Sequence, residues 1–229
     1  MFRIVTYNIR AGLGLDGVRS IRRIGDVLAS LNPDVVCLQE VDQHVLRSWL
    51  SNQPKFLSTR LGMQVMFQRN LRYGVGGFGN CILVKPLIMH CRCHSLPADG
   101  EPRGLVEVTA APGGHEVTIF CTHLSTEKEV RVRQAKEVVK IVKAVHGPHV
   151  LCGDMNDVMG SETLSTLLDD PVLRDSSLEI RPTYTPLSTK DHRKIDFVLA
   201  DLRFEVKDER VIDTNASDHL PVVVDLEAL

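Results

Sequence analysis

The sequence is poor in aromatic residues and has no excess of charge of either sign. Its 229 residues include one Trp and three Tyr, and 27 Lys and Arg against 29 Asp and Glu give a formal net charge of -2. Proteins that track single-stranded nucleic acid use aromatic faces for stacking, and tight duplex binders carry a basic excess. Nucleic acid therefore stays possible as a substrate, but the net charge does not indicate it.

Closely paired cysteines and long apolar segments are also missing. The six cysteines form no CxxC pair, and Cys91-Arg92-Cys93-His94 lacks the usual zinc spacing, which favours a structural role. No apolar run reaches the length of a transmembrane segment, and residues 1–7 are typical of a strand, not of a targeting segment. We expect a cytoplasmic protein with reduced thiols and no transmembrane segment. We also expect a monomer.

Apolar segments separated by turn residues run through the whole chain. Residues 2–8 predict a buried strand, apolar positions in residues 18–31 predict an amphipathic helix, and residues 35–41 predict a second strand. A strand-helix-strand unit usually gives parallel neighbours, so Asn8 and Glu40 are expected to end side by side.

Further strands and one more helix follow. Strand-like runs lie at residues 79–84, 105–109, 117–124, 150–152, 195–200 and 220–226. A capping-box spacing from Thr126 to Glu129 predicts a helix that Gly147-Pro148 ends. No repeat, linker or composition shift divides the chain, so we predict one α/β domain with two sheets over residues 1–229.

Short polar segments interrupt or follow these apolar strands. They are Tyr7-Asn8-Ile9, Gln39-Glu40-Val41, Gly153-Asp154-Met155-Asn156 and Ser217-Asp218-His219-Leu220-Pro221. Scaffolds usually carry their chemistry at such strand ends. Taken together, the four segments predict one metal-assisted site that cleaves a phosphate ester.

Glu40 and Asn8 are candidate metal ligands. An unpaired charge at the end of an apolar strand is costly, and a hard cation such as Mg²⁺ would satisfy the Glu40 carboxylate through oxygen ligands. Asn8 can add a neutral oxygen or a water-mediated contact. Each residue alone has another explanation, since Glu40 can pair with an arginine and Asn8 can cap a turn.

Asp154 and Asn156 are candidates for handling water and phosphate. In an extended segment both side chains point the same way, while Met155 points into the core. Asp154 can accept a proton from water, and Asn156 can donate to a phosphoryl oxygen. By itself, however, Gly-Asp-x-Asn is also a common turn sequence.

Two histidines have a context that suggests chemistry. His219 follows Asp218, which faces another way in an extended strand, so we expect its orienting carboxylate to be Asp196. An imidazole held by a carboxylate is a natural general acid or base. His123 lies at another strand end and is expected to bind phosphate as a cation.

The chain resembles the endonuclease/exonuclease/phosphatase superfamily. The matching segments are, in order, Thr6-Tyr7-Asn8, Leu38-Gln39-Glu40-Val41, Gly79-Asn80, Thr122-His123-Leu124, Gly153-Asp154-Met155-Asn156, Ile195-Asp196 and Ser217-Asp218-His219. The resemblance implies a four-layer α/β/β/α sandwich of two packed mixed sheets and in-line attack of water on phosphorus. It also implies Mg²⁺ or Mn²⁺, bound chiefly through Glu40 with Asn8 and Asp218 beside it.

The resemblance further implies roles for the remaining candidates. It makes Asp196 and His219 a catalytic pair and places Asn8, Asn156 and Asp154 around the phosphate and nucleophile. It leaves open whether Asp154 or His219 is the general base. Asn80 would contact the substrate phosphate. Arg103 can bind phosphate bidentately, or it can form a salt bridge with Glu101 or Glu107.

The branch of the superfamily is less well defined. Apurinic-site endonucleases typically carry an acidic residue where this chain has Arg10 and a Tyr where it has His123, which disfavours that branch. The segments 79–83 and 101–105 look more like small bacterial metallohydrolases. A basic stretch, Lys190, His192, Arg193 and Lys194, could form a rim near Asp196.

We therefore predict a divalent-metal-dependent phosphoesterase whose substrate is a phosphodiester of nucleic acid or of a small or lipid molecule. One alternative is a phosphomonoesterase acting on a small phosphorylated substrate. Another is a phosphate-binding module without catalysis on the same fold, and a DNA-binding protein would need a basic groove that the net charge disfavours.

Overall fold

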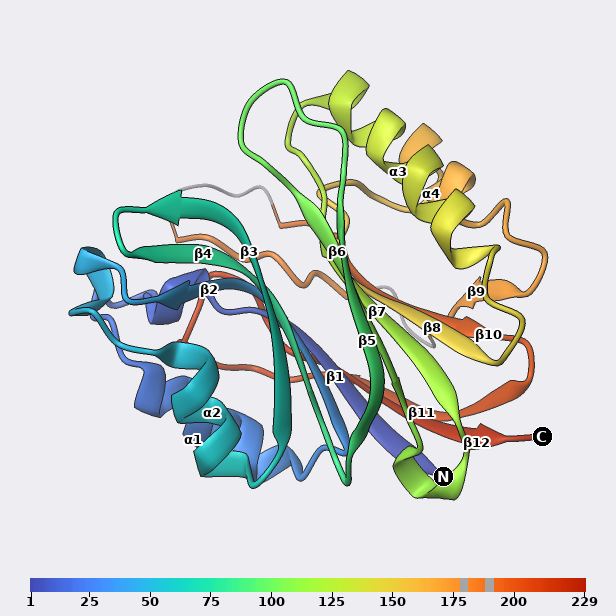
Figure 1. The fold of residues 1–229 in the computed structure, drawn as a ribbon, viewed down its shortest axis with the longest axis horizontal. Helices are drawn as coiled ribbons and strands as arrows, with labels where there is room; N and C mark the ends of the chain where they lie inside the picture. The colour runs from blue at the N-terminus through green and yellow to red at the C-terminus, as the bar shows by residue number, and fades with distance from the viewer. Residues whose placement is uncertain (178–180, 188–191) are drawn as a thin grey trace.

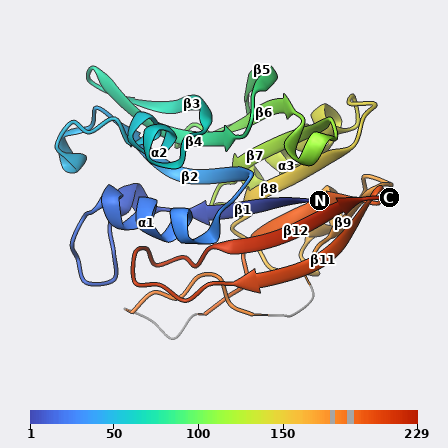
Figure 2. The same ribbon diagram turned by 90° about the horizontal axis from the view of Figure 1, so that it is seen from below.

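Two six-stranded sheets pack face to face, and helices cover their outer faces (Figures 1 and 2). The structure is a computed structural model that describes residues 1–177, 181–187 and 192–229. The first sheet has the order β11 (Phe204–Val211), β12 (Val222–Ala228), β1 (Phe2–Asn8), β2 (Val35–Gln43), β4 (Gly76–Val84) and β3 (Gln64–Tyr73). The second has the order β5 (Ile88–Ser95), β6 (Gly104–Ala110), β7 (Val117–His123), β8 (His149–Asp154), β10 (Asp196–Asp201) and β9 (Leu173–Asp175).

In the described residues, four α-helices form the two outer layers. Helices α1 (Ile21–Leu31) and α2 (Gln53–Leu61) cover the first sheet, and α3 (Lys128–Val142) and α4 (Glu162–Leu167) cover the second. The predicted four-layer α/β/β/α sandwich is therefore confirmed. None of the helices in the described ranges has the length and apolar character needed to cross a bilayer.

The apolar core has one inner and two outer parts. Between the sheets lie residues such as Ile4, Val108 and Ile119, all fully buried. One outer cluster includes the buried Leu28 of α1, and the other includes Val138 of α3. Each sheet is thus apolar on both faces, which explains why its central strands are nearly continuous runs of Val, Ile and Leu.

Two parallel strand pairs determine where polar side chains gather. β1 and β2 are parallel and are joined through α1, and β7 and β8 are parallel and are joined through α3. The predicted strand-helix-strand unit at the start of the chain is confirmed. Because both strands of a parallel pair end at the same edge of their sheet, each pair brings two carboxyl-terminal ends together.

The second predicted helix starts later than its sequence suggests. The capping box would place the cap at Thr126, but α3 begins at Lys128 after Glu127, which makes no side-chain capping hydrogen bond. Thr126 lies instead on the wall of a pocket. The capping-box prediction was wrong because Arg131 of α3 donates to the backbone oxygens of Ser125 and Thr126, which holds this turn outside the helix.

Candidate active site

The ends of five strands bring polar side chains to one edge of the sandwich. Asn8 ends β1, His123 ends β7, Asp154 ends β8 and Asp196 begins β10, while Glu40 lies near the end of β2. In the ladders of the second sheet, Asp154 is the register partner of both His123 and Asp196. A pocket of about 280 Å³ opens here, lined by Arg10, Glu40, Arg103, His123, Thr126, Asp154, Asn156, Tyr184, Arg193, Ile195, Asp218 and His219.

Glu40 reaches this pocket through a bulge in β2. The β2–β4 ladder changes register between Leu38 and Val41, and Glu40 has a left-handed backbone with φ of 57°. A bulge redirects a side chain that would otherwise follow the alternation of the strand. A left-handed non-glycine residue is strained by roughly 1–3 kcal/mol, and such strain is often found at functional sites.

The surroundings of Glu40 fit a bound cation. Its Oε1 accepts a hydrogen bond from Asn8 Nδ2 at 3.2 Å, and no basic side chain in the described residues forms an ion pair with it. Burial raises the pKa of Glu40, and although Asn8 and His219 oppose this shift, the nearby negative charge of Asp218 adds to it. Two carboxylates that repel each other beside a pocket provide the oxygen ligands that a hard divalent ion prefers.

Asp218 is partly neutralised within the protein. Its Oδ2 lies 3.2 Å from Nη1 of Arg10, and Ser217 Oγ donates to its Oδ1 at 3.3 Å. Arg10 follows β1 with a left-handed backbone, φ 47°. Of these two carboxylates, Glu40 is therefore the one with no cationic partner among the described side chains.

Asn8 connects the two sheets at the base of the site. Its Nδ2 donates to Glu40 in the first sheet and to Asp154 Oδ2 in the second, the latter at 3.0 Å. Its Oδ1 accepts from the backbone N–H of Arg10 at 3.1 Å. Asn8 thus caps a turn, which is one of its two sequence interpretations, and also holds two site carboxylates, while the oxygen expected as a possible metal ligand accepts from the backbone.

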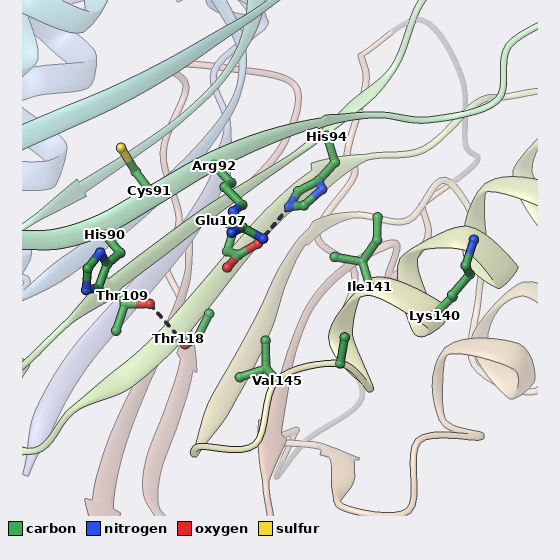
Figure 3. Close-up of a pocket in the computed structure, with 11 residues that line it drawn as sticks. His90, Cys91, Arg92, His94, Glu107, Thr109, Thr118, Lys140, Ile141 and Val145 are labelled. Atoms are coloured by element: carbon green, nitrogen blue, oxygen red, sulfur yellow. Dashed lines mark hydrogen bonds and ion pairs between the residues drawn. The ribbon is translucent and has the colours of Figure 1, made fainter.

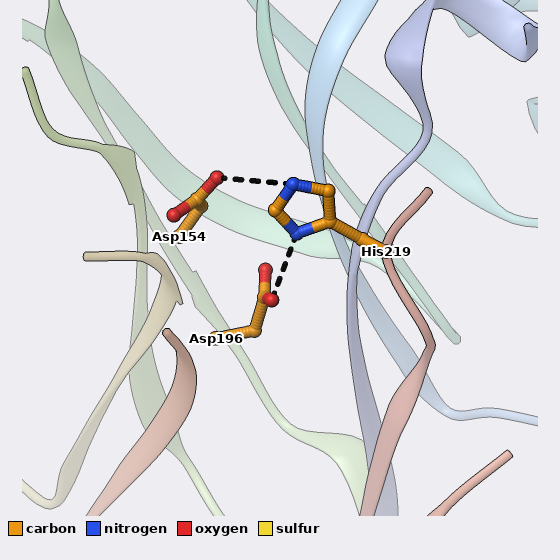
Figure 4. A group of neighbouring side chains, drawn as sticks. All are labelled: Asp154, Asp196 and His219. Carbon is orange, nitrogen blue, oxygen red and sulfur yellow. Dashed lines mark hydrogen bonds and ion pairs between the residues drawn. The ribbon is translucent and has the colours of Figure 1, made fainter. Parts of the chain in front are cut away.

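His219 lies between two buried carboxylates (Figure 4). Its Nδ1 is 2.9 Å from Asp196 Oδ2, the pairing expected from the sequence, and its Nε2 is 3.7 Å from Asp154 Oδ2. These three residues form the one group in the described ranges whose ligand atoms are close enough to hold a metal. Because His219 and Asp196 are already bonded to each other, the arrangement suits proton transfer better than coordination.

The charges of this group depend on one another. Burial alone would lower the pKa of His219, but Asp196 and Asp154 outweigh it and raise that pKa to about 10. Burial, with the charge of Asp196 adding to it, raises the pKa of Asp154 to about 7. The imidazole is therefore a cation at neutral pH, and Asp154 titrates near neutrality.

His123 differs from its predicted state. Its Nε2 lies 3.4 Å from Asp154 Oδ2, as expected for a strand-end residue at the site. Burial lowers the pKa of His123 well below its ordinary value, and the positive charges of Arg103 and His219 lower it further. The ring is therefore neutral, which does not fit the cation expected from the sequence.

Asn156 lies in the pocket for a different reason than predicted. β8 ends at Asp154, and Asn156 is in a left-handed turn with φ of 51°, so the two residues do not alternate along one extended segment. The backbone N–H of Asn156 donates to Asp154 Oδ1 at 2.9 Å, and its Nδ2 donates to Leu124 O at 2.8 Å. The turn itself brings the amide to the pocket wall.

The two predicted phosphate contacts lie in different places. Arg103 lines the pocket, and its Nη1 is 3.3 Å from Glu101 Oε1, so it pairs with this residue and not with Glu107. Its Nε is buried without a hydrogen-bond partner. Asn80 is buried behind the pocket wall, where its Nδ2 donates to Gly104 O at 3.2 Å.

Several residues around the site were not identified from the sequence. Thr183 Oγ1 donates to Asp196 Oδ2 at 2.6 Å, and the Tyr184 ring centroid lies 4.9 Å from that of His219. Neither residue lies in a recognisable motif, and their contacts span long sequence separations. Of the predicted basic rim, Arg193 lines the pocket and Lys190 lies outside the described residues.

A larger hollow, of about 600 Å³, lies between β5 and α3 (Figure 3). It contains none of the predicted site residues. His94 Nε2 lies 2.6 Å from Glu107 Oε2, and Thr109 Oγ1 and Thr118 Oγ1 bond to each other, while His90, Arg92 and Lys140 also line the hollow. Cys91 and Cys93 are exposed free thiols on β5, and their structural role stays a prediction.

Comparisons with known proteins agree with this geometry. The sequence model of the Endonuclease/Exonuclease/phosphatase family matches residues 5–219. A comparison with curated proteins finds no match. Among solved structures, an endonuclease/exonuclease/phosphatase from Beutenbergia cavernae is 27% identical, with a TM-score of 0.82 over 99% of this chain and 71% of its own.

Two further structures share the fold at lower identity. A mannosyl-6-phosphatase from Bacteroides thetaiotaomicron is 21% identical, with a TM-score of 0.74 over 99% of this chain and 100% of its own. The catalytic domain of human Nocturnin, solved with a bound sulfate anion, is 19% identical, with a TM-score of 0.76 over 100% of this chain and 93% of its own.

Proposed function

Because the chain belongs to the Endonuclease/Exonuclease/phosphatase family, we propose that it hydrolyses a phosphodiester with the help of a divalent cation, Mg²⁺ or Mn²⁺. Proteins of this family act on phosphate esters. The observation that carries the proposal is the cationic His219, held by Asp196 and Asp154 in the pocket that Glu40 also lines. A phosphate in this pocket would lie beside a proton donor, a proton acceptor and Glu40, a carboxylate that has no cationic partner among the described side chains.

Glu40 is the proposed main metal ligand, with Asp218 beside it. When bound, the cation would offset negative charge on the phosphoryl oxygens. Asn8 holds the Glu40 carboxylate in place through its Nδ2. Since Arg10 already pairs with Asp218, we assign Asp218 a smaller share of the binding.

We assign the proton acceptor to Asp154 and the cationic contact to His219. Asn8 Nδ2 and the N–H of Asn156 fix the orientation of the Asp154 carboxylate, which is suited to take a proton from water. Asp196 keeps the proton of His219 on Nδ1, so Nε2–H is free to donate to a phosphoryl oxygen. His123 remains neutral and supports Asp154.

Arg103 and Asn156 are the further proposed phosphate contacts in the pocket. Both residues line the pocket, the buried Nε of Arg103 has no hydrogen-bond partner, and the Asn156 amide, which donates to Leu124 O, would have to share or exchange this bond to reach a phosphate. Asn80 acts indirectly in this proposal, because its hydrogen bond to Gly104 O supports the backbone next to Arg103.

The carboxylates of the pocket favour a diester over a monoester, while its cationic side chains act in the opposite direction. Three carboxylates, those of Glu40, Asp154 and Asp218, line it. A diester carries one negative charge and a monoester up to two, so the carboxylates repel a monoester more strongly. Three arginines in the lining, Arg10, Arg103 and Arg193, and the cationic His219 would favour a monoester, so the ratio of diester to monoester turnover is the deciding measurement.

Release of p-nitrophenol from bis-p-nitrophenyl phosphate and from p-nitrophenyl phosphate tests the proposal. The purified protein is assayed with Mg²⁺, Mn²⁺ or EDTA, next to Glu40→Gln and His219→Ala. Glu107→Gln is the matched control, since that carboxylate lies in the other hollow. We expect metal-dependent release, faster from the diester, that falls by roughly 100-fold or more in both site variants.

Two outcomes would contradict the proposal. A His219→Ala enzyme of normal rate would remove the assigned chemistry. Binding of inorganic phosphate or vanadate without turnover of either ester in any metal would instead indicate the phosphate-binding module.

We also propose a monomer in a reducing, cytoplasmic setting. The support is that Cys37, Cys81, Cys121 and Cys152 are buried free thiols, and burial raises the pKa of the first three well above the ordinary value. Such thiols pack as small apolar side chains. Light scattering and thiol titration of the native protein test both points.

A further inference from the structure

An exposed apolar patch lies on two neighbouring loops, at residues 44–50 and 73–75. Its members, called here the loop patch, are Leu46, Trp49, Leu50, Tyr73 and Val75. Leu46 is 81% exposed, Trp49 75% and Val75 85%. The two loops enclose a hollow of about 480 Å³ whose lining is mostly apolar. Single exposed apolar residues are common, but a cluster of five needs an explanation.

The protein holds the loop patch in a fixed shape. Gly76 allows the β3–β4 turn to approach the first loop so closely that a Cβ there would lie 2.2 Å from His44 O. The guanidinium of Arg47 bonds to Asp42 and lies over the rings of Tyr73 and Phe78, at 5.8 and 4.9 Å from their centroids. The two loops therefore form one surface.

The backbone of the first loop is strained in the conformation that exposes these side chains. His44, Trp49 and Leu50 all have left-handed backbones, with φ of 54°, 53° and 57°. For bulky side chains this conformation is unfavourable, and it persists only where the surrounding structure imposes it. If the exposed Trp49 had no function, we would expect a sequence in which this loop has an unstrained backbone.

The surrounding sequence is basic. Residues 43–98 contain no Asp or Glu and seven Lys and Arg, although the whole chain has a net charge of -2. Two of these, Arg69 and Arg72, are exposed on β3, the strand that leads into the β3–β4 turn. Arg22 and Trp49 also line one shared hollow on the α1 side of the loop. The loop patch is thus an apolar surface with a cationic border.

We propose that the loop patch docks the protein on an anionic lipid surface. Trp and Tyr favour the boundary between headgroups and acyl chains, aliphatic side chains such as Leu46 and Val75 enter it, and arginines attract anionic headgroups. A nucleic acid would use the arginines but leave the aliphatic side chains in water. A second copy of the chain would bring two cationic borders together, which is unfavourable.

This docking surface is continuous with the candidate active site through β2. The strand carries Glu40 and leads directly into the first loop, and Figure 1 shows both loops at one end of the first sheet. Docking would therefore hold the pocket near lipid headgroups. The lipid contact does not depend on the proposed hydrolysis, because the two use different side chains.

Trp49 makes the experiment direct, since it is the only Trp in the chain. Its fluorescence is recorded with vesicles of phosphatidylcholine alone and of phosphatidylcholine with 30% phosphatidylglycerol, together with vesicle sedimentation. We expect a blue shift and sedimentation on anionic vesicles that weaken with added salt. In the double variant Leu46→Ser, Val75→Ser, which keeps the reporter, binding should weaken by roughly tenfold or more.

Three controls separate this proposal from others. Leu87→Ser changes a residue of comparable exposure after the far end of β4, and it should bind like the unmodified protein. Glu40→Gln and His219→Ala should also bind normally, which distinguishes docking from catalysis. Far-UV circular dichroism and thermal unfolding check that each variant is folded.

The proposal is wrong if anionic vesicles cause no shift, or if the double variant binds as tightly as the unmodified protein. A larger shift with a short single-stranded oligonucleotide than with vesicles would identify a nucleic-acid surface instead. A concentration-dependent shift without vesicles, with a dimer in light scattering, would identify a self-association surface.

Discussion

Asp196 holds the ring of His219, and Thr183 in turn holds the carboxylate of Asp196. Asp196 Oδ2 accepts from His219 Nδ1 at 2.9 Å and from Thr183 Oγ1 at 2.6 Å, and Thr183 Oγ1 accepts from the N–H of Asp196 at 3.1 Å. The carboxylate therefore has little rotational freedom. It fixes both the position of the ring and the ring nitrogen that carries the proton.

Replacing Asp196 by Asn should lower kcat by roughly 100- to 1,000-fold with little change in KM. An amide can present Nδ2–H to His219, which favours the wrong tautomer and removes the charge that stabilises the imidazolium. Steady-state kinetics with the diester surrogate measure this. Thr183→Val, which removes the hydrogen bonds of Thr183 Oγ1 but keeps the negative charge of Asp196, should have a smaller effect, and the reverse order would contradict the assignment.

The pH–rate profile should be bell-shaped. Burial and the charge of Asp196 raise the pKa of Asp154 to about 7. Activity should therefore rise as the pH increases through this value, because Asp154 must be deprotonated to accept a proton. Against the effect of burial, Asp196 and Asp154 raise the pKa of His219 to about 10. Activity should therefore fall at high pH, because His219 must keep its proton. In Asp196→Asn both limbs should move to lower pH, since the negative charge that raises both pKa values is gone. Unmoved limbs would show that other groups control the profile.

Glu40→Gln should weaken binding of Mn²⁺ by at least roughly tenfold, because an amide oxygen replaces a charged ligand. Isothermal titration calorimetry measures this without substrate. Asp218→Asn should weaken binding less, since Arg10 already neutralises part of that charge. Equal losses in both variants would mean that the two carboxylates share the ion evenly.

Gly153→Ala should destabilise the protein by about 1–3 kcal/mol and reduce activity. A Cβ at Gly153 would lie 2.0 Å from Thr122 O, so β8 would have to move away from β7 and carry Asp154 with it. Urea unfolding gives the stability change. Gly100→Ala is the matched control, because nothing lies within 4 Å of a Cβ there. A stable, active Gly153→Ala protein would show that the strands adjust freely.

The sequence was most informative where a signal is local and continuous. The apolar run of β1 predicted its bounds, and the strand-helix-strand order predicted that Asn8 and Glu40 meet. β11 was missed because a bulge between Val206 and Asp208 breaks its alternation, and β5 because most of its side chains are exposed. α2 was missed too, although Asn52 and Pro54 mark its start.

At the site, residue types were easier to predict than their states. The pairing of His219 with Asp196 could be predicted because a histidine that acts in catalysis needs a carboxylate to orient it. The charge of His123 could not, because it depends on burial in the folded protein and on Arg103. The left-handed backbone of Glu40 has no sequence signal, since glutamate does not favour it. Tyr184 and Arg10 were not assigned to the site because their partners lie far along the chain.

The place of β12 between β11 and β1 affects how this protein is made. β1 is synthesised long before β12, but these two strands are neighbours in the first sheet, where Phe2 pairs with Leu226. The first sheet therefore stays open along an inner edge during most of translation. His219 lies three residues before the start of β12. A nascent chain therefore acquires its proposed proton donor only when this gap closes, and unfinished chains should be inactive.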